Sequence, residues 1–181
     1  MNKLLILICG VVLLALGMFL FPDYFPVKDG SQEQVAATAS STGQRVPPKG
    51  WLEYRNSRYR ISLFYPEDLS VSEVDEGKAA MTITFQNAKD VKGFQMFVLP
   101  YSGVQVSEER FKQDVPSGVR TDLADIEVDG ATGAAFYSND VALGETYEVW
   151  FIRRGYLYEV TTLKPLDTWL SDIMQSWKFT L

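Results

Sequence analysis

The strongest constraint on this chain is a run of uncharged, apolar residues near its N-terminus. Between Leu4 and Phe21 the sequence carries no charged side chain over 18 residues. At about 1.5 Å per residue, a helix of this length nearly spans the roughly 30 Å hydrocarbon core of a bilayer. The run is apolar on every side, unlike the amphipathic helix of a soluble domain. We therefore predict one transmembrane anchor within residues 1–23, with residues 4–21 in the membrane.

The residues that flank this run predict its orientation and fate. Lys3 precedes the run and Pro22 follows it, so the positive-inside rule keeps the N-terminus in the cytoplasm. The run is longer than the roughly 7–15-residue apolar core of a cleaved signal peptide, which favours an uncleaved signal anchor. A cleaved signal peptide and a lipoprotein signal at Cys9 are the alternatives. We expect a single-pass membrane protein whose C-terminal part is extracytoplasmic.

Residues 24–50 differ sharply in composition from the segments on either side. They are rich in Ser, Thr, Ala, Gln, Gly and Pro and contain few large apolar side chains. Such a segment buries too little apolar surface to offset the entropy cost of ordering. We predict a disordered linker with an average end-to-end distance of roughly 25–30 Å. One soluble domain follows it over residues 51–181.

Composition excludes several classes of function. The chain has no histidine, and its single cysteine lies in the predicted anchor. Ser-His-Asp and Cys-His catalysis and cysteine-based zinc sites are therefore excluded. The net charge of −6 argues against nucleic acid as a partner, because such binding needs a cationic surface. We expect no cofactor.

Alternation of apolar and polar residues dominates the predicted soluble domain and indicates strands. We predict a strand through Tyr59, Ile61 and Leu63, half-buried on that face, and strands near 81–86, 94–99, 131–138, 146–153 and 156–163. Arg154-Gly155 is typical of a short hairpin turn. Consecutive hairpins predict an antiparallel sheet.

Two segments carry helix signals instead. Ser107 followed by two glutamates is typical of an N-cap and opens a short helix to about Asp114. Pro165 precedes a second apolar face that includes Trp169 and Leu170, in a helix ending near Ser176 and followed by a short strand. Helices need a sheet face to cover, so we predict an α+β domain: a twisted antiparallel sheet covered by helices.

Several of these segments, in this order, resemble the PsbP-like family, named for the extrinsic protein of photosystem II. The residues that carry the resemblance are Tyr59–Pro66, Val128–Gly130 with Phe136-Tyr137, Gly155–Thr162, and Trp169 with Ile173–Phe179. The resemblance implies an α-β-α sandwich and a binding or assembly role on the outer face of a membrane, without catalysis. The histidines proposed as metal ligands in plant members have no counterpart here.

One acidic motif is a weak candidate for a calcium site. Asp125, Glu127 and Asp129 precede Gly130 with the spacing that opens a calcium-binding loop. Phe136 stands where the loop's closing glutamate belongs, and Ile126 alternates with the acids as in a strand. The alternative is an exposed strand face that leads into an Asp-Gly turn.

Other clusters have a structural and a functional interpretation each. We interpret Glu73, Asp75 and Glu76 as a charged hairpin loop, although paired carboxylates also serve hydrolases. Arg55, Arg58 and Arg60 are interpreted as a solvent-facing set, with an anion or single-strand site as the alternative. Trp150, Phe151, Tyr156 and Tyr158 are interpreted as core and cross-strand pairs, with a ligand pocket as the alternative.

The sequence thus predicts a membrane-anchored, extracytoplasmic binding or scaffold module that is not an enzyme. Its expected contacts are the membrane, through residues 4–21, and a protein or envelope partner. A small-molecule carrier with an aromatic pocket and a carboxylate-dependent hydrolase are the alternatives.

Overall fold

The computed structural model describes residues 45–180, and the chain divides between Pro47 and Pro48 into two compact units. The second unit contains every helix and strand described below. The predicted anchor and most of the predicted linker lie outside the described residues. Within residues 45–180, no helix combines the length and apolar character needed to cross a membrane.

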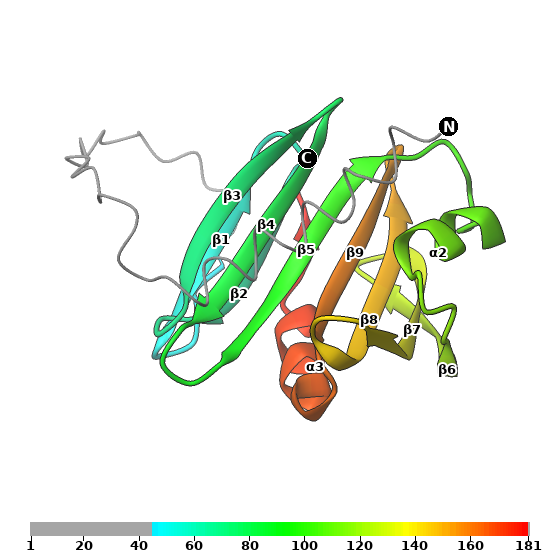
Figure 1. Ribbon diagram of the computed structural model, residues 1–181. Helices are drawn as coiled ribbons and strands as arrows, with labels where there is room; N and C mark the ends of the chain where they lie inside the picture. Colours follow the sequence, from blue (N-terminus) through cyan, green and yellow to red (C-terminus); the bar gives the residue numbers. More distant parts are fainter. Residues whose placement is uncertain (1–44, 181) are drawn as a thin grey trace. The chain divides into compact units, whose positions relative to one another are not determined.

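The second unit is built on a seven-stranded antiparallel sheet in the order β3-β4-β5-β9-β8-β7-β6. All but one of the neighbouring pairs are also neighbours in sequence, so the sheet is mostly a series of hairpins; β9 pairs with β5 at the centre (Figure 1). The strands are β3 (Ser70–Gly77), β4 (Ala80–Asn87), β5 (Lys92–Pro100), β6 (Thr121–Val128), β7 (Ala131–Asp140), β8 (Gly144–Arg153) and β9 (Tyr156–Leu163).

A smaller sheet and two helices complete this unit. The smaller sheet has the order β1-β2-β10, from β1 (Trp51–Asn56), β2 (Ile61–Pro66) and β10 (Lys178–Phe179). Helix α2 (Glu108–Asp114) connects β5 to β6, and Ser107 caps it by accepting a hydrogen bond from the Arg110 N–H. The 3-10 turn η1 (Lys164–Leu166) leads into helix α3 (Asp167–Gln175).

One face of the large sheet carries the main hydrophobic core. The small sheet and α3 cover this face, and their buried residues join one cluster with those of β4, β5, β8 and β9. Aromatic rings are central to it: Phe85 stacks on Phe94 with centroids 4.4 Å apart, and Phe151 stacks on Tyr158 at 5.0 Å. Trp177, just after α3, is 1% exposed and meets Phe151 edge-on.

Helix α2 covers part of the opposite face. Phe111 and Val115 pack there against Phe136 of β7 and Trp150 of β8, forming a second and much smaller apolar cluster. The period of two along a strand explains the division, because Trp150 and Phe151 are neighbours that point to opposite faces. The fold is therefore mixed α+β with elements on both faces of the large sheet, and the sequence prediction of an α+β domain is confirmed at that level.

Two details of the prediction were wrong. Glu73, Asp75 and Glu76 lie in strand β3 and not in a loop; the hairpin turn is Lys78-Ala79, where both residues have positive φ. Strand β2 is buried on both faces, since Ser62 is 1% exposed, so it is not half-buried. The pairing of β3 and the burial of β2 both depend on residues far away in the sequence, so local alternation did not reveal them.

Candidate functional site

The calcium motif lies in strand β6 and the turn that follows it. Asp125 and Glu127 are exposed on β6. The Asp129 carboxylate binds elsewhere, at 2.6 Å from Lys178 Nζ and 2.7 Å from the Phe179 N–H, which holds β10 against the β6–β7 turn. Within residues 45–180, no group of three or more acidic or cysteine side chains is arranged to hold a metal ion. The structure therefore brings the three acids into a strand and a turn, not a calcium loop.

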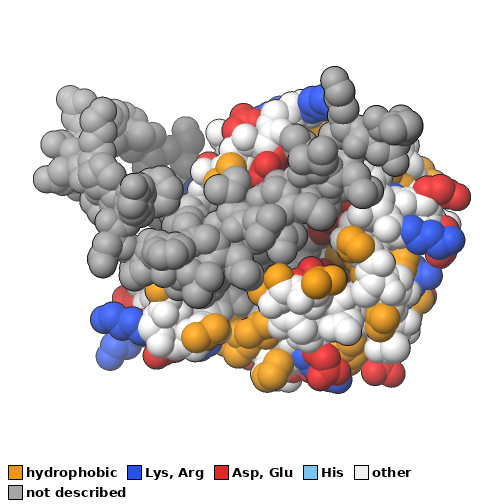
Figure 2. Space-filling view, in the orientation of Figure 1, with side chains coloured by type: hydrophobic (Ala, Val, Ile, Leu, Met, Phe, Trp, Pro, Cys, Tyr) orange, Lys and Arg blue, Asp and Glu red, His pale blue; other side chains and the backbone are white. Residues whose placement is uncertain are grey.

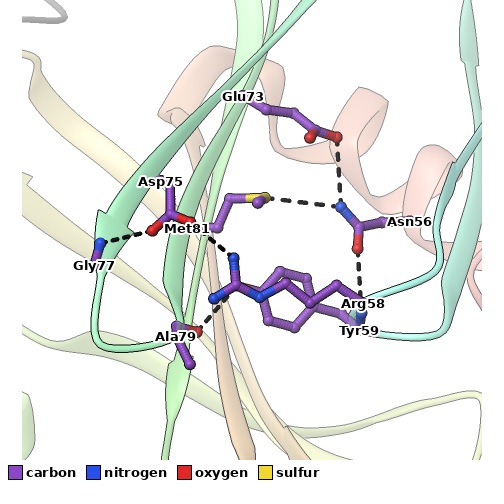
Figure 3. A network of polar contacts seen from close by, with 8 residues as sticks. All are labelled: Asn56, Arg58, Tyr59, Glu73, Asp75, Gly77, Ala79 and Met81. Atoms are coloured by element: carbon purple, nitrogen blue, oxygen red, sulfur yellow. Dashed lines mark hydrogen bonds and ion pairs between the residues drawn. The ribbon is translucent and has the colours of Figure 1, made fainter.

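Of the acidic and basic clusters between residues 55 and 76, Asp75 and Arg58 meet each other, and Glu73 bonds to Asn56 (Figure 3). Glu76 instead accepts a hydrogen bond from Thr82. Asn56 is the hub: its side-chain N–H groups donate to Tyr54 at 3.0 Å and to Glu73 at 3.4 Å, and its oxygen accepts from the Tyr59 N–H at 3.1 Å. The Tyr54 hydroxyl also donates to Glu73. The network joins the β1–β2 turn to strand β3.

An exposed ion pair flanks this hub. Arg58 lies 3.1 Å from Asp75, whose other oxygen accepts from the Gly77 N–H at 2.8 Å. These two donors lower the pKa of Asp75, with the Gly77 N–H as the larger cause. Arg55 pairs with Glu53 of its own strand. Two of the three arginines thus have carboxylate partners, and Arg58 and Asp75 fasten the small sheet to the large one instead of presenting an anion site.

The four aromatic residues near the β8–β9 hairpin do not line a common pocket. Phe151 and Tyr158 are a stacked cross-strand pair in the core, and Tyr156 packs edge-on against Tyr59. Trp150 points to the opposite face, under α2. The interpretation of these residues as core and cross-strand pairs is confirmed.

A group of ionisable residues that the sequence analysis missed lies beneath α2. Glu148 of β8 is buried among donors: Thr146 Oγ at 2.8 Å, Thr161 Oγ at 2.6 Å and Trp150 Nε1 at 3.2 Å. Burial raises the pKa of Glu148, and the three hydrogen bonds oppose that rise without removing it. A carboxyl group in this position resists ionisation because no cation neutralises it at close range.

The neighbouring strand supplies a second buried carboxyl group. Glu159 of β9 is 7% exposed and lies beside Asp114 at the end of α2. Arg110, one turn earlier, pairs with Asp114 and lies 3.8 Å from the Glu159 carboxylate. We call Arg110, Asp114, Glu148 and Glu159 the α2 cluster: it holds three carboxyl groups and one guanidinium, which lies within ion-pair distance of Asp114 and Glu159 but not of Glu148.

This imbalance of charge decides where the protons lie. Burial raises the pKa of Glu159 well above its ordinary value, and the negative charge of Asp114 raises it further. Burial also raises the pKa of Asp114, although Glu159 and Arg110 oppose that rise. The arrangement favours a protonated Glu159 beside an ionised Asp114 that pairs with Arg110. The α2 cluster is thus able to hold and release protons.

A small polar cavity adjoins the α2 cluster. It has a volume of about 50 Å³ and is lined by Asp114 and Glu148 together with Ser117, Ser138, Asp140 and Thr146 among others. Ligand pockets are typically several hundred cubic ångströms, so this cavity suits a few water molecules and not a metabolite.

Part of the α2 cluster can be recognised in the sequence. Arg110 and Asp114 are four residues apart, which places them on one side of a helix. Glu159 interrupts the otherwise apolar run Tyr156–Val160, and the period of two puts it beside Leu157 and Thr161 on one sheet face. Alternation alone does not tell which face a helix covers, so the burial of Glu159 could not be read from the sequence.

Comparison with known proteins supports the fold and goes no further. No family model matches the chain, and no curated protein matches it. Among solved structures, the solution structure of cyanobacterial PsbP (CyanoP) from Synechocystis sp. PCC 6803 is similar, with a TM-score of 0.53 and 11% sequence identity. The similarity covers 78% of this chain and 98% of that one. At this identity the likeness establishes a PsbP-like fold.

Proposed function

We propose that this chain is a membrane-anchored binding or scaffold module whose PsbP-like domain lies outside the cytoplasm and performs no catalysis. The apolar run from Leu4 to Phe21 supports the anchor, because its length matches a bilayer. The partner is a protein or another envelope component, since the acidic chain is unsuited to nucleic acid.

The observation that carries the non-catalytic part of the proposal is where the ionisable groups lie. The carboxyl groups with raised pKa values beneath α2 are Asp114, Glu148 and Glu159, and the cavity that Asp114 and Glu148 line has a volume of only about 50 Å³. A carboxylate-dependent glycoside hydrolase needs two carboxyl groups on either side of a cleft that admits its substrate. A carrier function with an aromatic pocket is not supported either, because Phe151 and Tyr158 pack inside the main hydrophobic cluster.

The anchor and its orientation are tested by protease protection in membrane vesicles prepared with the cytoplasmic face enclosed. A C-terminal epitope on the full chain should sediment with membranes, resist carbonate extraction and be removed by added protease. Replacing Leu13 and Leu14 with arginine should shift the chain into the soluble fraction, since each charge at the centre of a span costs about 2.5–3.5 kcal/mol. A wild-type chain that stays soluble, or an epitope that resists protease, would contradict the proposal.

The binding role is tested by photo-cross-linking in intact cells. A photoreactive amino acid at Val104 or Val141, which are 93% and 95% exposed, leaves the core untouched. The proposal expects a discrete cross-linked species of defined mass from at least one exposed position. A scan of exposed positions that yields only the uncross-linked chain would contradict it.

A further inference from the structure

The two edge strands of the large sheet differ in what their acidic side chains do. On β3, Glu73 and Asp75 are bonded to Asn56 and Arg58 of the small sheet. On β6, the side chains of Asp125 and Glu127 are exposed, and neither has a hydrogen-bond or ion-pair partner within residues 45–180. Strand β6 forms one edge of the large sheet (Figure 1). Its two carboxylates carry negative charge that no contact within the described residues neutralises.

The hairpin that joins β6 to β7 decides which backbone groups face outward. Its turn is Asp129-Gly130, where both residues have positive φ, and Val128 pairs with Ala131 across it. In such a two-residue hairpin the residues that flank the turn form a hydrogen-bonded pair, and hydrogen-bonded positions then alternate along the strand. The N–H and C=O groups of Asp125 and Glu127 consequently point away from β7, toward the open edge.

This edge has a regular stretch of limited length. Pairing with β7 is continuous from Ala124 to Val128 and is interrupted by a bulge between Thr121 and Ala124. Asp122, inside the bulge, has a φ of 54°. An incoming strand therefore has about five residues of straight edge, with Asp125 and Glu127 offering four outward backbone groups.

We propose that this edge binds an extended, basic peptide segment of a protein partner, which adds to the sheet as a strand next to β6. The inference rests on the proposed binding function and names the chemistry of its partner. Added strands gain affinity from backbone hydrogen bonds and specificity from alternate side chains. The same carboxylates disfavour pairing with the β6 strand of a second copy, because like charges would face each other across the new pair.

The two faces of β6 define the pattern of the peptide. Asp125 and Glu127 point to the face that α2 partly covers, so residues opposite them should be Lys or Arg. Ala124 and Ile126 point to the core face, where Ile126 packs against the main hydrophobic cluster. Residues beside them should be apolar. The partner segment therefore alternates basic and apolar residues over about five positions.

The test measures binding of a fluorescent peptide of four Lys-Val repeats to the full chain in detergent. We expect saturable binding, and protection of the Asp125 and Glu127 backbone amides from hydrogen exchange. Asp125→Lys with Glu127→Lys should weaken binding at least about tenfold. The control Glu67→Lys with Asp172→Lys makes the same change in net charge at two exposed carboxylates that have no partner within the described residues. It should leave the affinity within about twofold.

A second peptide separates strand addition from charge attraction. N-methylation of every second residue keeps the charge of the peptide and removes backbone donors, and it can be placed on the odd or on the even residues. Only one of these two peptides loses the donors that face β6, so only that one should fail to bind. Equal binding of both N-methylated peptides, or no saturation up to about 1 mM, would overturn the inference. If the Asp125→Lys, Glu127→Lys chain loses the peptide but still forms the cellular cross-linked species, the edge binds basic strands and that partner uses another surface. If the wild-type chain forms no cross-linked species, the proposed function itself fails.

Discussion

The two faces of the seven-stranded sheet are stabilised in different ways. The face under the small sheet and α3 is closed by aromatic and aliphatic side chains, with Leu63, Ile83 and Phe151 fully buried. Under α2, a cluster of four buried apolar residues lies beside the α2 cluster with its three carboxyl groups. On the surface shown in Figure 2, apolar side chains lie among charged ones.

This difference separates the part of the domain that sets stability from the part that responds to solvent. Buried apolar area stabilises a fold at every pH. A buried carboxyl group whose pKa is raised on folding, such as Glu159, stabilises the fold only while it holds its proton. Helix α2 is only seven residues long, too short to be stable without tertiary contacts. We therefore expect the core face to unfold only with the whole domain and α2 to open locally, more often as pH rises.

The largest effect should come from the core face. Phe151→Ala removes a fully buried ring that touches Tyr158, Trp177 and Phe179. The lost transfer free energy and the cavity left behind should lower the free energy of unfolding by about 3–5 kcal/mol. Urea denaturation followed by far-ultraviolet circular dichroism measures it. A loss below about 1 kcal/mol would show that this face does not dominate stability.

A smaller effect is expected at the rim of the core face, where Asn56 joins the two sheets. Asn56→Ala leaves the buried Tyr54 hydroxyl and the Tyr59 N–H without this partner. Unsatisfied buried groups cost about 1–3 kcal/mol, so we expect a loss of about 2 kcal/mol in urea denaturation. Asn87→Ala, at a half-buried residue whose side-chain hydrogen bonds lie at the surface, is the matched control. Equal losses in the two variants would contradict the role of Asn56.

On the α2 face the expected effect depends on pH. The pKa of Glu159 is raised in the folded chain, so its proton stabilises the fold fully below the ordinary value of 4.5, and this contribution is lost as pH rises through the raised pKa. Glu159→Gln cannot ionise and should flatten the fall of the unfolding free energy above pH 4.5. Urea denaturation at a series of pH values measures the two slopes. Parallel slopes in wild type and variant would contradict the assignment; Glu145→Gln, at an exposed ion pair, should keep the wild-type slope.

The smallest effect should come from the exposed ion pair of the Figure 3 network. Arg58→Gln removes the partner of Asp75, but the Gly77 N–H still binds that carboxylate. Exposed ion pairs contribute about 0–1 kcal/mol, so the change in thermal midpoint should be within a few degrees. A larger loss at low salt that vanishes at high salt would show that the pair contributes more than its exposure suggests.

The elements of the fold were largely predictable from the sequence, whereas the contacts between distant elements were not. Strict alternation at Met81, Ile83 and Phe85 and the Ser107 cap signal identified elements that the structure contains, because local patterns determine them. Strand β3 was missed since Glu73 and Asp75 resemble a loop until they meet Asn56 and Arg58 from the other sheet. No local pattern shows such a contact.

The most direct test of the division between the two faces is hydrogen exchange of the full chain at several pH values, corrected for intrinsic exchange rates. We predict that amides of β5 and β9 exchange only through global unfolding, at rates that report the same free energy. Amides of Phe111 to Val115 in and after α2 should exchange through a local opening that grows as pH rises, and Glu159→Gln should suppress that growth. Protection of α2 equal to that of β5 and β9 at every pH would contradict the account.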